Sequence, residues 1–237
     1  TAVAFSWTCQ RAGSAVPALL WGVAFGNIVR GVEIDDKKEY VGTFFDLLNP
    51  YALLGGLVTL SLFVTHGAVF LSLKTLGDVR DRAKALALRV GLVAAALAVT
   101  FLVWTYIERD GAEHRSAFAA LAVVAAISLV GGLFATLKNR EGWAFIGTAL
   151  TLATAVAALF TVLFPEVMPS SLDAAWSLTT TNASSTHHTL TIMTWVAAIF
   201  TPIVLVCQGW SIYVFRARLG VHHIPDDKPA EELLTTA

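Results

Sequence analysis

Charged residues and cysteines are scarce in this sequence of 237 residues. Asp, Glu, Lys and Arg make up 14% of it, against roughly 25% in ordinary soluble domains. The 16 basic and 17 acidic residues give a net charge of −1, so the sequence lacks the basic excess of a nucleic-acid-binding protein. Its two cysteines are too few for a disulfide framework or a tetrahedral zinc site. The composition therefore predicts no nucleic-acid partner and no metal site.

Apolar residues make up 56% of the chain, and its mean hydropathy is +0.69. A membrane helix needs about 20 mostly apolar residues, and six continuous stretches meet that requirement. Their apolar residues do not alternate with polar ones, as the strands of a membrane barrel would require. The sequence thus predicts an all-α, polytopic membrane helix bundle with six transmembrane helices, near residues 12–29, 47–73, 83–107, 116–137, 143–164 and 189–215. We expect the bundle to occupy residues 1–221 and a flexible cytoplasmic tail to follow at 222–237.

The orientation of the helices follows from the basic residues near their ends. Eleven Lys and Arg residues fall on the side that carries both ends of the chain, and five fall on the other side. The richer side holds Arg11, Lys74, Arg80, Arg82, Lys84, Arg89, Lys138, Arg140, Arg216, Arg218 and Lys228. We therefore expect both ends of this segment to lie in the cytoplasm.

Proline and glycine mark the ends and the packing faces of the predicted helices. Asn49-Pro50 is typical of a helix start, because proline in the first turn loses no hydrogen bond. Pro17 and Pro202 lie inside predicted spans, where we expect kinks. The Gly22–Gly26 pair has GxxxG spacing, which favours close helix contact in membranes. Further small surfaces are expected at Gly55-Gly56 and Gly131-Gly132.

Few residues within the spans could bind a redox cofactor. A b-type haem needs axial His or Met ligands, usually on facing helices, and His66 is the single histidine well inside a span. Met193 is the one residue that could be paired with it. We favour the alternative that His66 hydrogen-bonds a neighbouring helix, and we leave open a proton relay or a quinone contact.

Glu108 is the best candidate for a proton pathway, since no Asp or Glu lies in the middle of a span. Its place near the outer end of a span equally fits an ordinary interfacial carboxylate. No GxSxG, GxxxxGK[ST], HExxH or CxxC motif is present. We therefore expect no catalytic residue on this chain.

Several short segments, in the same order, resemble subunit II of the cytochrome bd-type quinol oxidase family. The run GVAFGNIVRG resembles a helix end of that family, and FFDLLNPYALLGGL resembles the following helix start. The other similar segments are Thr65-His66-Gly67-Ala68, Phe164-Pro165, Val167–Ser171 and Leu190–Ala197. Together they extend over nearly the whole chain, about residues 22 to 216. The resemblance implies about nine helices in the family, of which the first three are expected to precede this chain.

The resemblance also implies a function. It predicts an accessory subunit of a quinol:oxygen oxidoreductase, a terminal oxidase of aerobic respiration in the bacterial cytoplasmic membrane. Quinol oxidation would be coupled to reduction of dioxygen to water and to a proton gradient. A larger subunit I would carry haems b558, b595 and d. Small accessory subunits, membrane lipid and a structurally bound quinone are further expected partners.

Two other functions remain open from the sequence. The first is a secondary transporter or a fragment of one, because Pro17 and Pro202 could break helices as in transporter binding sites. No internal repeat and no midplane charge accompany them. The second is an assembly factor that leaves the complex once it is active.

Overall fold

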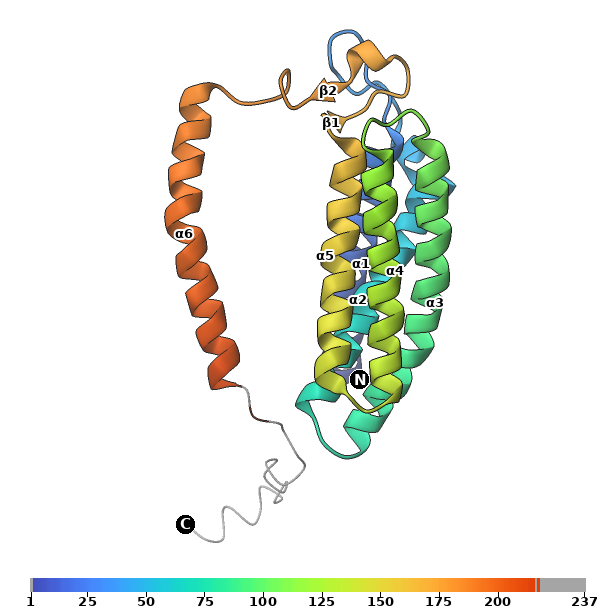
Figure 1. The fold of residues 1–237 in the computed structure, drawn as a ribbon, viewed down its shortest axis with the longest axis vertical. Helices are drawn as coiled ribbons and strands as arrows, with labels where there is room; N and C mark the ends of the chain where they lie inside the picture. The colour runs from blue at the N-terminus through green and yellow to red at the C-terminus, as the bar shows by residue number, and fades with distance from the viewer. Residues whose placement is uncertain (1, 216, 218–237) are drawn as a thin grey trace.

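The computed structural model describes residues 2–215 and 217, and this range contains six α-helices (Figure 1). They are α1 (Ala2–Arg30), α2 (Pro50–Lys74), α3 (Asp78–Glu108), α4 (Arg115–Leu137), α5 (Glu141–Leu163) and α6 (His187–Val214). Each predicted span lies within or almost within one of them. The tail predicted at 222–237 lies outside the described residues.

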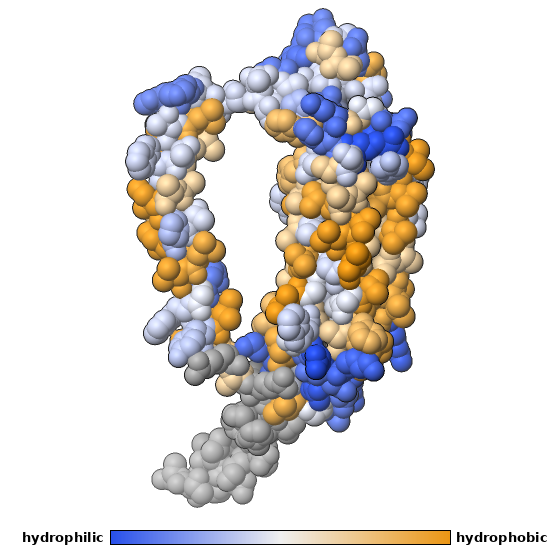
Figure 2. Space-filling model, viewed as in Figure 1, coloured by the Kyte–Doolittle hydropathy of each residue, from blue (hydrophilic) through white to orange (hydrophobic). Residues whose placement is uncertain are grey.

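Five of these helices, α2 to α6, are long and apolar enough to cross a membrane. The apolar residues form a broad band along the helices, with hydrophilic residues gathered at both ends (Figure 2). The chain is therefore a polytopic helical membrane protein. Residues 12–29, the first predicted span, form the C-terminal part of α1, which is not among these five helices.

Helices α2 to α5 form a four-helix bundle, and α1 packs on its outside against α2. Contacts run from α2 to α3, from α3 to α4, from α4 to α5 and back from α5 to α2, which closes the ring. Several helices cross closely at glycine, and the predicted Gly22–Gly26 pair is one of these places. A Cβ atom added at Gly26 would lie 2.8 Å from the Cα of Ala52 on α2, and one at Gly147 would lie 2.8 Å from the Cα of Gly132 on α4. Gly131 takes no part in this packing, since nothing lies within 4 Å of its Cβ position.

One end of the bundle is covered by the long connections 31–49 and 164–186, and we call it the capped end (Figure 1). The second connection contains two short strands, β1 (Glu166–Met168) and β2 (Leu178–Thr179), paired antiparallel, and the 3-10 turn η2 (Ala174–Trp176). The first contains η1 (Phe44–Leu48). The all-α prediction missed this small sheet because a strand pair of five residues leaves no hydropathy pattern. The predicted start of the second span at 47 was early, since α2 begins at Pro50.

Helix α6 stands apart from the bundle (Figures 1 and 2). None of its residues is buried. At the far end from the cap, the Lys74 Nζ atom donates a hydrogen bond of 3.0 Å to the Phe215 carbonyl, directly after α6. Both α1 and α6 continue as helices through the prolines predicted to kink them, Pro17 and Pro202.

Candidate functional site

The two connections at the capped end are joined to each other by the backbone. The Val32 N–H donates to the Pro169 carbonyl at 3.0 Å, and the Ser171 N–H donates to the Val32 carbonyl at 2.9 Å. The Lys38 Nζ atom adds a hydrogen bond of 2.7 Å to the Ala175 carbonyl. These bonds hold the cap over the ends of α1, α3 and α5.

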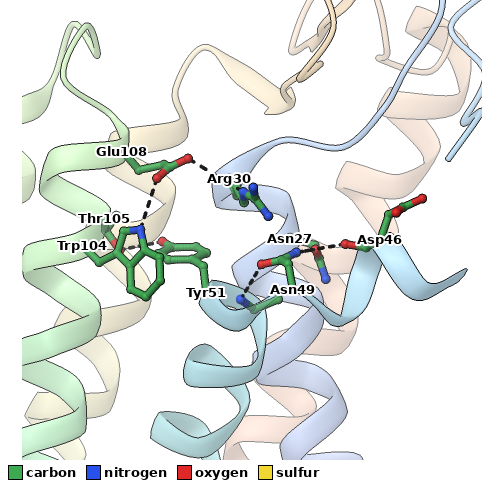
Figure 3. Close-up of polar contacts among 9 residues, drawn as sticks. Asn27, Arg30, Asp46, Asn49, Tyr51, Trp104, Thr105 and Glu108 are labelled. Carbon is green, nitrogen blue, oxygen red and sulfur yellow. Dashed lines mark hydrogen bonds and ion pairs between the residues drawn. The ribbon is translucent and has the colours of Figure 1, made fainter. Parts of the chain in front are cut away.

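Two asparagine side chains fasten α1, η1 and α2 together beneath the cap (Figure 3). The Asn27 amide, 6% exposed, donates to the Leu47 carbonyl at 2.7 Å and to the Val23 carbonyl at 3.0 Å. Its oxygen accepts a hydrogen bond of 2.8 Å from Asn49 Nδ2. Asn49 in turn caps α2, since its side-chain oxygen accepts from the Ala52 N–H at 2.9 Å. The carbonyl oxygen and the NH2 group of both side chains are used in these hydrogen bonds, so the pair is a structural clamp.

A second buried contact joins α2 to α3. The Tyr51 and Thr105 hydroxyls lie 2.6 Å apart, and the two residues are 1% and 0% exposed. Thr105 donates its own hydrogen to the Phe101 carbonyl, so Tyr51 is the donor in the contact between helices. The Tyr51 ring also stacks on Phe101, with 4.9 Å between centroids, and meets Trp104 edge-on at 5.6 Å.

Glu108, the predicted candidate for a proton pathway, is the last residue of α3 at the capped end. The Trp104 indole N–H donates to it at 3.3 Å, and the Arg30 guanidinium lies 3.8 Å away (Figure 3). Both charged side chains are partly exposed, 44% for Arg30 and 35% for Glu108. They face a cavity of about 530 Å³ whose lining includes residues of α1, η1 and α3. The sequence placed this carboxylate correctly at a helix end but did not predict its partners.

His66, the other predicted candidate, lies on α2 and contacts α5. Its Nδ1 atom and the Thr148 hydroxyl share a hydrogen bond of 2.8 Å, and its ring stacks on Phe145 at 4.8 Å. The structure thus shows the helix-to-helix hydrogen bond that we favoured for His66. Met193, the alternative partner, lies on α6, which does not pack against α2. The structure therefore does not bring His66 and Met193 together.

The opposite end of the bundle carries an ion pair that the sequence analysis did not predict. Arg80 Nε donates to Glu141 Oε1 at 2.9 Å, and the Glu141 side chain is only 8% exposed. Lys84 donates to the Asn139 side chain nearby. Within the described residues, no group of three or more His, Cys, Asp and Glu side chains could hold a metal ion.

An apolar cavity of about 400 Å³ lies lower in the bundle, lined by residues of α1 to α5. Its polar lining atoms include the hydroxyls of Thr59 and Thr151, which already donate to carbonyls of their own helices, those of Gly55 and Gly147. The cavity therefore offers hydrophobic contact and few free hydrogen-bonding groups.

The polar contacts that sequence reasoning missed also include the Asn27–Asn49 clamp and the Tyr51–Thr105 pair. One signal was available for Asn27, because it directly follows Gly26 at a predicted close crossing. A polar residue at such a crossing must find its partner on the facing helix.

Comparison with known proteins gives consistent results over most of the chain. The family described as cytochrome bd terminal oxidase subunit II matches residues 4–215. The chain is 35% identical over 209 residues to cytochrome bd ubiquinol oxidase subunit 2 of Bacillus subtilis, with 88% of this chain and 62% of the relative covered. For the probable cytochrome oxidase subunit 2 of Haemophilus influenzae the identity is 36% over 255 residues, with 92% and 66% covered. For cytochrome bd-I ubiquinol oxidase subunit 2 of Escherichia coli K12 it is 33% over 241 residues, with 87% and 64% covered. The chain thus spans a little under two thirds of these curated relatives.

Proposed function

Because this chain belongs to the cytochrome bd terminal oxidase subunit II family, we propose that it is an accessory membrane subunit of a quinol:oxygen oxidoreductase. The complex oxidises quinol, reduces dioxygen to water and adds to a proton gradient. A larger subunit I carries the redox centres, and this chain stabilises it. Relatives that are named as ubiquinol oxidase subunits support this assignment.

Helix α6 is the observation that carries the stabilising role. It is long and apolar, yet none of its residues is buried. It meets the rest of the chain through the connection at the capped end and through the Lys74–Phe215 hydrogen bond. Helices in a membrane associate by close packing and hydrogen bonding. We propose that α6 is packed by helices outside the described bundle, and that subunit I supplies some of them.

We also propose that α1 crosses the membrane, which gives six spans in this chain. It packs along α2 through Gly22 and Gly26, so its C-terminal part runs through the same apolar layer as α2. The excess of Lys and Arg supports a cytoplasmic position for both ends of the segment. The capped end then faces outwards, and the membrane is the bacterial cytoplasmic membrane.

The described residues do not fit a haem bound by His66 and Met193. The helices that carry the two candidates, α2 and α6, do not pack together, so the two side chains do not face a common site. We therefore assign haems b558, b595 and d to subunit I. The apolar cavity fits the isoprenoid tail of a structural quinone, because its walls are hydrophobic and its threonine hydroxyls are used. The cavity would take up the tail and not the headgroup.

The proposal is tested by visible difference spectra of membranes, reduced minus oxidised, with the whole chain, without the chain, and with α6 removed after Thr186. We expect haem b and d bands and a co-purifying subunit I only with the whole chain. The chain without α6 should still be detected on a gel, which separates lost assembly from lost expression. Replacement of His66 by alanine should leave all haem bands in place.

Normal oxidase spectra and activity in the deletion strain would overturn the proposal. Substrate uptake by vesicles that contain this chain alone would then favour a transporter. Presence of the chain only in immature complexes would favour an assembly factor.

A further inference from the structure

The cavity at the capped end is lined by charged side chains of both signs, with carboxylates in excess. One cation, Arg30, faces it together with three carboxylates, Glu33, Asp46 and Glu108. Helices α1 and α3 end at this cavity and bring the negative ends of their dipoles, whereas α2 begins beside it at Asn49 and brings the positive end of one dipole. The excess of carboxylates therefore favours a ligand with a cationic group. The Arg30 guanidinium can bind an anionic group of the same ligand.

Several of these charged groups have few hydrogen bonds in the described part of the chain. Asp46 is engaged by the Thr43 N–H and hydroxyl, both at 2.7 Å. Glu108 accepts only the long bond of 3.3 Å from Trp104, and Arg30 stays 3.8 Å from Glu108, beyond hydrogen-bond distance. No side-chain hydrogen bond of Arg30 or Glu33 is formed within residues 2–215. A guanidinium and two carboxylates thus remain available to a ligand.

The surroundings of the cavity place it where lipid headgroups begin. Phe44 and Phe45 on η1 are 68% and 79% exposed, and Phe45 and Leu47 help to line the cavity. Trp104, 38% exposed, turns its indole N–H towards Glu108 at the end of α3 (Figure 3). Exposed aromatic residues that lie beside charged residues at the ends of membrane helices are typical of the membrane–water interface.

We propose that this cavity binds the headgroup of a phospholipid that carries both a phosphate and a primary ammonium group. The planar Arg30 guanidinium donates hydrogen bonds to the phosphate oxygens. The ammonium group donates to Glu33 and Glu108, which are acceptors when ionised. The acyl chains follow the apolar band below the exposed aromatic residues. This site is independent of the proposed oxidase function.

Other ligands match the lining less well. An anionic headgroup without an amine would place its phosphate among three carboxylates and would leave two of them unpaired. A choline headgroup brings the positive charge but no N–H donor, so Glu33 and Glu108 would gain no hydrogen bond from it. A bare metal ion would lack a ligand set, since no group of His, Cys, Asp and Glu suited to a metal is found among the described residues.

The test is native mass spectrometry of the detergent-purified whole chain in its complex, titrated with phosphatidylethanolamine, phosphatidylcholine or phosphatidylglycerol. We expect phosphatidylethanolamine to bind about tenfold more tightly than the other two, because charged hydrogen bonds distinguish it. This comparison uses the unaltered protein, so it does not depend on any variant folding. Equal binding of the three lipids would overturn the proposal.

Variants then locate the site. Arg30→Gln and Glu108→Gln should each weaken phosphatidylethanolamine binding by about tenfold. Lys37→Gln and Glu113→Gln are matched controls, because each removes one charge, from the 31–49 connection and from the α3–α4 connection respectively, and neither residue lines the cavity. These controls should bind as the natural chain does. If phosphatidylethanolamine binding is weakened equally in all four variants, or in none of them, the assignment to this cavity is contradicted.

Discussion

Replacement of Gly22 by alanine should force α1 away from α2. The added Cβ atom would lie 2.4 Å from the Gly55 carbonyl oxygen, 2.5 Å from Thr59 Oγ1 and 2.7 Å from the Gly56 Cα. Two of these three atoms belong to the backbone, so a change of rotamer cannot relieve the contact. Ordinary contact between carbon atoms needs about 3.5 Å, which means that the helices must separate locally by about 1 Å.

The expected cost follows from two opposing effects. Overpacking of a tight interface costs about 1–3 kcal/mol. Alanine in place of glycine within a helix gives back about 0.5–1 kcal/mol of conformational entropy. The net loss should therefore lie within about 0–2.5 kcal/mol, and we expect the upper half of that range because two of the three close atoms belong to the backbone. Gly131→Ala is the matched control, since nothing lies within 4 Å of that Cβ position and only the favourable effect remains.

The assay is reversible unfolding of the purified protein in mixed micelles, with the midpoint followed by helical circular dichroism. Gly22→Ala should lower the free energy of unfolding, whereas Gly131→Ala should leave it unchanged or raise it. Equal stability of the two variants would refute the reasoning that the Gly22 crossing is a contact at its steric limit.

Three further predictions concern the polar contacts. Asn49→Ala removes both the cap of α2 and half of the buried amide clamp, so the free energy of unfolding in the same assay should fall by about 1–3 kcal/mol; an unchanged value would show that the clamp is dispensable. Hydrogen bonds from the Thr43 hydroxyl and N–H hold the pKa of Asp46 below its usual value. These bonds should therefore stabilise η1 fully above the unfolded pKa of about 4, and their contribution should be lost as the pH falls through the folded pKa. Hydrogen exchange across η1 measures this loss, and Thr43→Val should raise the pKa of Asp46 and move the transition to higher pH. Glu141→Gln leaves the Arg80 guanidinium without its buried carboxylate partner, so it should destabilise the protein by about 1–3 kcal/mol. The control Glu113→Gln should change the stability little. A similar loss of stability in both variants would contradict the importance of burial.

The sequence predicts the helices of this fold well because the membrane thickness limits the length of an apolar run. Most predicted boundaries lie within about three residues of a helix end. The largest difference is at α1, which begins at Ala2 and not at 12, and the next largest is at α3. Helix α3 begins at Asp78 and not at 83, because Asp78 and Asp81 suit the first turn of a helix although they are not apolar. Hydropathy marks where a helix meets lipid, whereas capping residues mark where it starts.

The candidate site was predicted only in part, for a different physical reason. Glu108 and His66 were recognised because an ionisable residue in or beside a span is conspicuous. Their partners Arg30 and Thr148 lie 78 and 82 positions away in the sequence, and such pairing depends on which helix faces meet. The Gly22–Gly26 spacing predicted that a close contact exists but not that Ala52 and Gly55 receive it.

The separation of α6 has a consequence for how the chain is made. The α4–α5 connection is only three residues long, and the two helices meet closely at Gly132 and Gly147, so this hairpin can close as soon as both helices have entered the membrane. Helix α6 follows these helices in the sequence, and the described bundle of α1 to α5 buries none of its residues. On the described helices alone, α6 would therefore face lipid until a helix from outside this bundle packs against it.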